Sequence, residues 1–358
     1  MKREKTMEKV ADFMEKQKYP YEVKVRYAEK KCRDFVKSCE ERGLNCHVSV
    51  GGLDSITLLC FLRSIGIDIP ATSCSSLEDV SIRRIHKQLG VIELQPAMRS
   101  EEERWSKARI LQEFGFPVLS KEIAAKIDLL QHPSEKNKTV RHAIITGETG
   151  VYGGWQKNSR MKLSKKWLNL FAGYENENEG TNYQIAPFLV SSKCCYYLKE
   201  KPSDDWAKEH NSAPFVGLMA SEGGRREKAL KMHGCNYFGK TTTRSAPFAI
   251  FSRQDILQLA LDLKVPVPEI YGSIERKESG ELYTTLAQRT GCSMCGFGIH
   301  LETRPHRFDL LYDRNPREWD YWMNHCCKDA NGNDYGWGRV LDYIGVPWKP
   351  YKQYSIFE

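Results

Sequence analysis

Two groups of residues in this 358-residue sequence have the types and spacing needed for chemistry, and the first is a glycine turn. Gly51 and Gly52 end a short apolar run, and Asp54 and Ser55 follow at the start of a second apolar segment. Glycines can adopt positive φ and let backbone N–H groups approach a ligand closely. Asp54 or Ser55 can cap a helix that starts here, and the positive end of such a helix favours phosphate. An ordinary strand-to-helix turn explains this local pattern equally well.

The second group consists of cysteines. The adjacent Cys194 and Cys195 are followed far downstream by Cys292 and Cys295, which form a Cys-x-x-Cys turn flanked by glycines. Such a turn directs two sulfur atoms at one point, and four thiolates suit a 4Fe–4S cluster or, tetrahedrally, zinc. Cys235 is an alternate ligand in place of Cys194 or Cys195. The alternative for all of these residues is a set of structural thiols, and the adjacent pair at 326–327 has no evident partner in the sequence.

The elements that must position these residues follow an alternating order. The apolar run before Gly51 predicts a buried strand, and the segment after Ser55 predicts a helix. Further strands are expected at 67–74 and 91–94, with a helix at 81–89 between them. Strand, helix and strand at this spacing predict a parallel α/β sheet, in which ligands bind at the carboxyl ends of the strands. Glu78 follows the second strand and is therefore a site candidate, although a carboxylate at a helix start has an ordinary structural role as well.

We expect a Rossmann-like parallel sheet flanked by helices, with an N-terminal helical arm at 1–42 and a nucleotide-binding core at 43–262. A cysteine-containing C-terminal region at 263–358 completes the predicted organisation. The core carries a basic insertion at about 131–185, where the basic run 157–166 lies between Trp155 and Trp167. This run is suited to a polynucleotide or an acidic substrate, and a solvated face is the alternative.

Composition restricts the function classes. The net charge is +8, which favours anionic partners such as nucleotides or nucleic acid. No apolar run approaches the ~20 residues of a membrane span, and the charged N-terminus lacks a signal-peptide pattern. We therefore expect a cytoplasmic protein without a membrane partner, and leave its oligomeric state open. The 12 cysteines of such a chain indicate metal, cluster or redox chemistry rather than disulfides.

The glycine turn resembles the SGG-x-DS loop of the PP-loop ATP pyrophosphatases and their relatives, the phosphoadenosine-phosphosulfate (PAPS) reductases of phage and bacterial type. Val50 stands where the motif has serine, and Leu53 stands where many members have lysine. Residues 216–226, with Glu222, Arg225 and Arg226, resemble the glycine–arginine segment that contacts the anionic end of the substrate in that family. The two cysteine pairs resemble its cluster-binding pattern, and the similarity extends over about residues 25–348.

The resemblance implies an adenine-nucleotide-binding iron–sulfur protein. The resemblance favours an ATP-dependent sulfurtransferase, related to the enzymes of DNA phosphorothioation and tRNA thiolation. Gly51, Gly52 and Ser55 would then hold the phosphates, and Asp54 would help to position Mg²⁺. Glu78, Glu222 and Arg225 would be further residues of the nucleotide site. Asp54, Ser55 and Arg226 are the expected catalytic residues. A cysteine desulfurase would supply sulfur, DNA, RNA or another anionic molecule would accept it, and Cys235 would carry a persulfide if its pKa is depressed.

Two other functions stay open. A PAPS or APS reductase would release sulfite with the help of a thioredoxin-like reductant. However, such reductases attack with a cysteine near the C-terminus, whereas the last cysteine here is Cys327. The third option is a non-catalytic module that binds nucleotide or nucleic acid, because Val50 removes a hydroxyl group that would contact phosphate.

Overall fold

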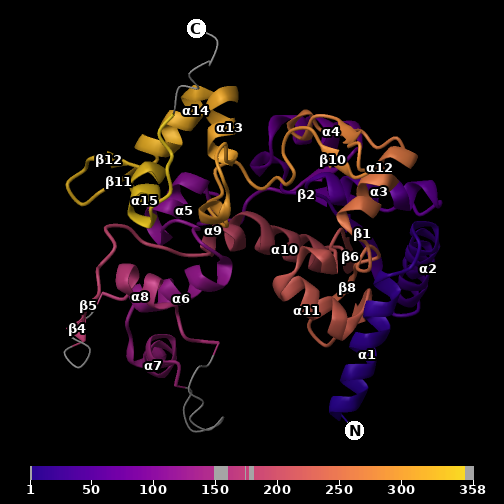
Figure 1. The fold of residues 1–358 in the computed structure, drawn as a ribbon, viewed down its shortest axis with the longest axis horizontal. Helices are drawn as coiled ribbons and strands as arrows, with labels where there is room; N and C mark the ends of the chain where they lie inside the picture. The colour runs from indigo at the N-terminus through magenta and orange to yellow at the C-terminus, as the bar shows by residue number, and fades with distance from the viewer. Residues whose placement is uncertain (1, 149–159, 174, 177–180, 351–358) are drawn as a thin grey trace. The chain divides into compact units, whose positions relative to one another are not determined.

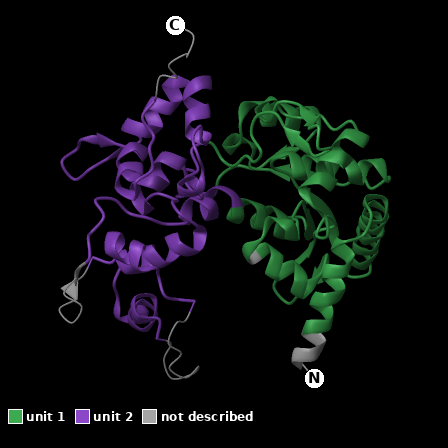
Figure 2. Ribbon diagram, in the orientation of Figure 1, with its two compact units in different colours: residues 1–96, 200–293 green, residues 97–199, 294–358 purple. Residues whose placement is uncertain are grey.

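A computed structural model describes residues 2–148, 160–173, 175–176 and 181–350 (Figure 1). The chain forms two compact units, each assembled from two separate stretches (Figure 2). The first unit contains Met1–Pro96 and Glu200–Ser293, and the second contains Ala97–Lys199 and Met294–Glu358. None of the described helices combines the length and the apolar character needed to cross a lipid bilayer.

The first unit is built on a six-stranded sheet in the order β3-β2-β1-β6-β8-β7. Neighbouring strands are parallel except β7 and β8, which are antiparallel. The strands are β1 (Asn45–Ser49), β2 (Ala71–Ser73), β3 (Ile92–Glu93), β6 (Ser212–Val216), β7 (Asn236–Phe238) and β8 (Thr243–Ser245). Helix α3 (Leu53–Ser64) connects β1 to β2, and α4 (Val80–Gln88) connects β2 to β3. The predicted parallel α/β sheet is confirmed, and it is compatible with a Rossmann-like fold.

The remaining helices of the first unit come from both ends of its sequence. They are α1 (Lys2–Gln17), α2 (Tyr21–Glu40), α10 (Lys201–Glu209), α11 (Gly224–His233) and α12 (Arg253–Asp262). The 3₁₀ turns are η1 (Ser75–Leu77), η4 (Ala220–Glu222) and η5 (Glu269–Tyr271), and a hairpin is formed by β9 (Ile274–Arg276) and β10 (Leu282–Thr284).

Helix α2 packs into the core of the first unit. Phe35 meets Phe215 of β6 edge to face, with ring centroids 4.9 Å apart, and both side chains are fully buried. The Lys24 ammonium group forms an ion pair with Asp255 of α12 at 2.8 Å. Residues 21–40 are therefore part of the core rather than an arm lying on it, because their apolar face fills the space beside the sheet.

The second unit is mainly helical. Its helices are α5 (Lys107–Phe114), α6 (Lys121–Gln131), α7 (Lys138–Thr146), α8 (Lys165–Phe171), α9 (Lys193–Cys195), α13 (Arg307–Arg314), α14 (Pro316–Asp320) and α15 (Trp337–Ile344). Short turns are η2 (Glu135–Asn137), η6 (Ile299–Leu301) and the π-helical η3 (Tyr196–Glu200) and η7 (Tyr321–His325). Two small hairpins pair β4 (Glu175–Asn176) with β5 (Thr181–Asn182), and β11 (Cys327–Lys328) with β12 (Asp334–Tyr335).

The core of the second unit gathers aromatic side chains from distant segments. Phe116 and Trp337 are both fully buried and meet edge to face, with ring centroids 5.0 Å apart. Ser120 caps α6, since its side chain accepts a hydrogen bond from the Ile123 backbone N–H at 3.2 Å.

The two units differ from the predicted division at 42/43 and 262/263. The chain passes between them after Pro96, Lys199 and Ser293. Residues 97–199 and 294–358 share one hydrophobic core, to which Phe116 and Trp337 both contribute. A prediction that divides the sequence into consecutive domains misses this arrangement, because the second core is assembled from stretches that are far apart in the chain.

Candidate functional site

The site lies where the strand order of the first unit reverses. Strand β1 pairs with β2 on one side and with β6 on the other, so the chain leaves β1 and β6 at one edge of the sheet. Ligands of open α/β sheets bind at such a switch point. Gly217 follows β6, and a Cβ atom added there would lie 3.1 Å from the Cα atom of Ser55. The absence of a side chain at Gly217 therefore lets the two loops approach closely.

The glycine turn is held by its own serine. The Ser55 hydroxyl accepts a hydrogen bond from the Gly51 N–H at 2.7 Å and donates one to the Gly52 carbonyl at 2.9 Å. Helix α3 has Gly52 as its N-cap, without a side-chain cap. The expectation that Asp54 or Ser55 caps this helix is therefore wrong: both lie in its first turn, because the chain enters the helix immediately after the glycines.

Tyr271 closes one side of the turn, and no sequence pattern pointed to it. Its hydroxyl oxygen accepts a hydrogen bond from the Leu53 N–H at 3.1 Å and lies 2.6 Å from the Thr290 hydroxyl. Burial raises the pKa of Tyr271, which is therefore a neutral phenol near pH 7. The first N–H groups of a helix are the ones that bind phosphate, and here the Leu53 N–H already has a partner.

His86 ties the glycine turn to the second strand end. Its Nε2 atom lies 2.8 Å from the Gly51 carbonyl oxygen, and its Nδ1 atom lies 2.8 Å from the Ser75 hydroxyl. A carbonyl oxygen only accepts, so the proton of this contact is on Nε2. Glu78 is buried beside the same turn, where its Oε1 atom would lie 4.0 Å from a Cβ atom added to Gly51. Glu78 therefore lies close to the glycine turn.

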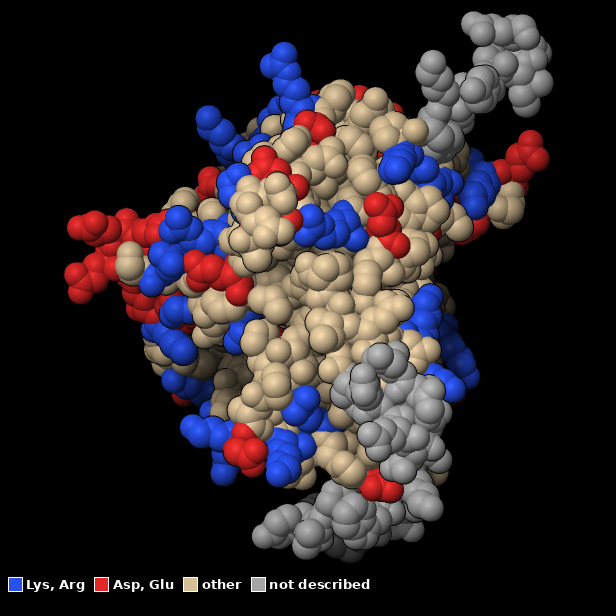
Figure 3. Space-filling model, turned by 90° about the vertical axis from the view of Figure 1, so that its left-hand side faces the viewer, with Lys and Arg blue, Asp and Glu red and all other residues tan. Residues whose placement is uncertain are grey.

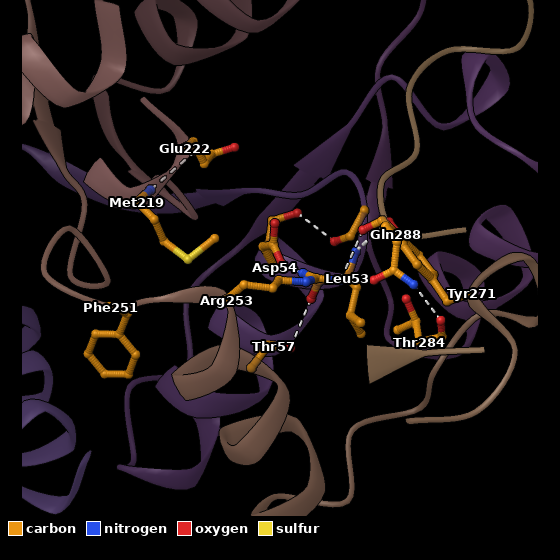
Figure 4. A network of polar contacts seen from close by, with 12 residues as sticks. Leu53, Asp54, Thr57, Met219, Glu222, Phe251, Arg253, Tyr271, Thr284 and Gln288 are labelled. Atoms are coloured by element: carbon orange, nitrogen blue, oxygen red, sulfur yellow. Dashed lines mark hydrogen bonds and ion pairs between the residues drawn. The ribbon is translucent and has the colours of Figure 1, made fainter. Parts of the chain in front are cut away.

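Asp54 lies near several charged side chains. It forms an ion pair with Arg253 of α12, and Arg253 also donates to the Gln288 carbonyl at 3.2 Å (Figure 4). Burial raises the pKa of Asp54, opposed by Arg253, Arg289 and Arg226 and assisted by Glu222. Three arginines therefore act on the carboxylate that follows the glycine turn, which makes this region suitable for an anionic ligand.

Glu222 and Arg226 border the same region from the loop after β6. Glu222 accepts a hydrogen bond from the Met219 N–H at 3.3 Å and forms an ion pair with Arg226 of α11. The Arg226 side chain is 55% exposed, whereas that of Glu222 is 10% exposed. A ligand from solvent can therefore reach the guanidinium group. Gly223 turns the chain between them at φ +76°, a conformation that favours glycine. The side chain of Arg225 lies outside the described residues.

Residues 288–293 run past the glycine turn. Gln288 contacts Arg253, Thr290 contacts Tyr271, and the Ser293 N–H donates to the Leu77 carbonyl at 2.9 Å. Cys292 is therefore carried by a segment that is hydrogen-bonded to the loop containing Glu78. No sequence signal revealed this, because the partners are joined only by tertiary contacts.

The four predicted cluster ligands are divided between the units. Cys292 belongs to the first unit, and Cys194, Cys195 and Cys295 belong to the second. Among the residues that the structure describes, no three His, Cys, Asp or Glu side chains are grouped so as to hold a metal ion. By their chemistry, the four cysteine thiolates suit an iron–sulfur cluster or zinc.

Cys235, the alternate ligand, is buried in the first unit. Its sulfur lies 3.9 Å from the hydroxyl oxygen of Tyr27 on α2. Burial raises the pKa of the Cys235 thiol, against the opposing effects of Tyr27, Lys31 and Lys16. The depressed pKa on which a persulfide at Cys235 depended is therefore not found, because desolvation disfavours the thiolate.

The predicted nucleic-acid surface is only partly described. Trp155 and Lys157 lie outside the described residues. Trp167 is buried in the core of the second unit, with the Lys166 ammonium group 4.6 Å from its ring centroid. It is therefore not a surface platform for a base. In the view of Figure 3, lysine and arginine side chains are interspersed with aspartate and glutamate around a largely uncharged area.

Models of known protein families give no match to this chain, and neither do curated protein sequences.

Proposed function

We propose that the first unit binds the phosphates of an adenine nucleotide at the switch point of its sheet. The observation that carries this proposal is the ion pair between Arg253 and Asp54, directly after the glycine turn, together with the partly exposed Arg226 that pairs with Glu222. Phosphate is recognised in proteins by guanidinium groups and by backbone N–H groups at helix N-termini. Both guanidinium groups are partly exposed, Arg253 at 29% and Arg226 at 55%, so a polyanionic ligand can compete with their carboxylate partners.

We further propose that the chain is a PP-loop protein related to the PAPS reductases and acts as an ATP-dependent sulfurtransferase. Ser55 orders the glycine turn, Asp54 would hold Mg²⁺ once nucleotide displaced Arg253, and Arg226 would neutralise charge on the departing pyrophosphate. Cys194, Cys195, Cys292 and Cys295 would hold a 4Fe–4S cluster or zinc. The cluster, when bound, would supply sulfur or electrons. The hydrogen bond from Ser293 to Leu77 supports a role for Cys292 close to the nucleotide.

The test is pyrophosphate release from ATP by the full-length protein, with and without DNA or RNA. We expect release that is abolished in Asp54→Asn and retained in Asp68→Asn, a matched change at a carboxylate whose side chain is 89% exposed. Equal loss of pyrophosphate release in both variants, or no loss in either variant, would contradict the proposed site. Thioredoxin-dependent formation of sulfite from PAPS would instead support a sulfonucleotide reductase.

A second candidate, nucleotide binding without cleavage, is favoured by a specific feature of the turn. Two of its backbone donors, the N–H groups of Gly51 and Leu53, already bond to the hydroxyls of Ser55 and Tyr271. Val50 is buried and offers no hydroxyl group. Tight ATP binding measured by calorimetry, together with no pyrophosphate release under any of these conditions, would establish the binding module.

A further inference from the structure

The adjacent residues Cys326 and Cys327 of the second unit take no part in the proposed function. Cys326 follows the π-helical turn η7, Cys327 begins β11, and both residues are buried. Their sulfur atoms lie 4.0 Å apart, and the Cys326 thiol donates to the Trp322 carbonyl at 3.3 Å. The Gln112 side chain fixes β11 from α5, because its amide donates to the Lys328 carbonyl at 3.0 Å and accepts from the Lys328 N–H at 2.7 Å. The two thiols are therefore held by a rigid frame.

The Cys326 sulfur lies close to the start of α15, because the Trp322 carbonyl that accepts its hydrogen bond also abuts Gly336. The neighbouring Cys327 side chain, which is hydrogen-bonded to Cys326, lowers the pKa of the Cys326 thiol; burial opposes this effect, and Lys107 and the Trp337 backbone N–H assist it. The same interaction raises the pKa of Cys327. A Cβ atom added to Gly336, the N-cap of α15, would lie 2.3 Å from the Trp322 carbonyl oxygen. Glycine at this position therefore lets the helix start approach the turn that carries Cys326.

Both thiols line a cavity of about 670 Å³. Its other lining residues are Arg99, Ser106, Ala108, Arg109, Gln112, Glu113, His325 and Lys328. Three of these side chains are cationic and one is a carboxylate, so the lining favours an anion.

The cationic side chains can be recruited by a ligand. Arg99 pairs with Glu113 at 2.9 Å, Lys328 pairs with Asp334 at 2.6 Å, and Arg109 pairs with Glu103. Every one of these carboxylate partners is more than a third exposed, including Glu113 at 35%. Exposed ion pairs of this kind contribute little stability and exchange readily with a competing anion.

We propose that Cys326 is a nucleophilic thiol that exchanges with small anionic disulfides bound in this cavity. The Cys326 thiol loses its proton, and its sulfur forms a bond to one sulfur of the disulfide R–S–S–R. The S–S bond of the ligand breaks, and the released half takes the bonding electron pair and a proton to leave as R–SH. The products are a mixed disulfide on Cys326 and one thiol, so the ligand itself is the oxidant. Cys327 donates to the attacking thiolate, and the cationic side chains hold the carboxylates of the ligand.

Thiol exchange on the reduced full-length protein tests this proposal. Glutathione disulfide, which carries carboxylates, and cystamine, which is cationic, are added in parallel, and peptide mapping by mass spectrometry locates the adducts. Cys60 is the internal control, because it is half-buried in the first unit and burial raises the pKa of its thiol. With glutathione disulfide, we expect Cys326 to react at least about tenfold faster than Cys60, since each pKa unit changes the thiolate fraction about tenfold.

Variants separate the role of Cys326 from that of the cavity. Cys326→Ser should remove the adduct, and Cys327→Ser should keep it at Cys326 but slow its formation. Arg109→Gln changes a side chain that is 43% exposed, so the fold is not at risk. It should slow the reaction with glutathione disulfide at least about threefold and leave the reaction with cystamine unchanged, because only the anion uses the guanidinium group. Equal rates at Cys326 and Cys60, or equal slowing with both disulfides in Arg109→Gln, would overturn the proposal.

Discussion

Replacing Gly52 by alanine should destabilise the first unit mainly through one atom, the hydroxyl oxygen of Tyr271. Gly52 has φ −78° and ψ −166°, which alanine adopts without strain. A Cβ atom there would, however, lie 2.3 Å from the Tyr271 oxygen and 3.0 Å from the Thr290 hydroxyl. Overpacking of this kind costs about 1–3 kcal/mol. Gly51→Ala is the matched control: its Cβ atom would meet nothing nearer than Ser55 Oγ at 3.8 Å. Its effect should therefore stay within about 0.5 kcal/mol.

Tyr271→Phe should relieve the overlap. With the oxygen removed, the nearest remaining atom of that ring lies 3.6 Å from the added Cβ atom, an ordinary contact. The single Tyr271→Phe change leaves the Leu53 N–H without its partner, at a cost of about 1–3 kcal/mol. The Gly52→Ala/Tyr271→Phe double variant should therefore be clearly more stable than the sum of the two single changes predicts.

Urea unfolding of the four full-length proteins, followed by circular dichroism, measures these free energies. Hydrogen exchange of peptides covering residues 50–60 shows whether the effect is localised at the start of α3. Additivity of the two changes within about 0.5 kcal/mol would refute the steric argument. A cost for Gly51→Ala equal to that for Gly52→Ala would refute it as well, because the two glycines would then share a backbone requirement.

Three further predictions concern protonation, charge and metal. Burial, with a smaller effect from His210, lowers the pKa of His47 to about 4. Unfolded His47 binds a proton below about pH 6.5 that the folded protein does not bind. The free energy of unfolding should therefore fall by up to about 1.4 kcal/mol per pH unit from pH 6.5 towards 4, and His47→Gln should flatten this limb in urea titrations. Arg253→Gln should weaken ATP binding by about 10–100-fold in calorimetry, since a bond to a charged group contributes about 1.5–3 kcal/mol, and an unchanged affinity would exclude Arg253 from the site. Protein purified without oxygen should be brown and contain iron, whereas a colourless preparation with stoichiometric zinc would contradict the cluster.

The sequence by itself determined the features that depend on neighbouring residues. The apolar run, the two glycines and the following apolar segment predicted β1, the turn and α3, because strand and helix periodicities are local properties. The cap at Ser120 is equally local, since its partner Ile123 is three residues away. The parallel sheet followed from the alternation of strands and helices, and this placed Glu78 beside the glycine turn.

Tertiary structure alone decided what surrounds that turn. Tyr271 is 218 positions from Leu53, and Arg253 is 199 positions from Asp54, so no periodicity or spacing connects them. The assignment of residues 97–199 and 294–358 to one unit depends likewise on side chains that meet only in the folded chain. The physical reason is that hydrogen bonds and ion pairs between distant segments depend on how the elements pack. The sequence predicts each element locally, but it does not show which side chain of one element reaches another.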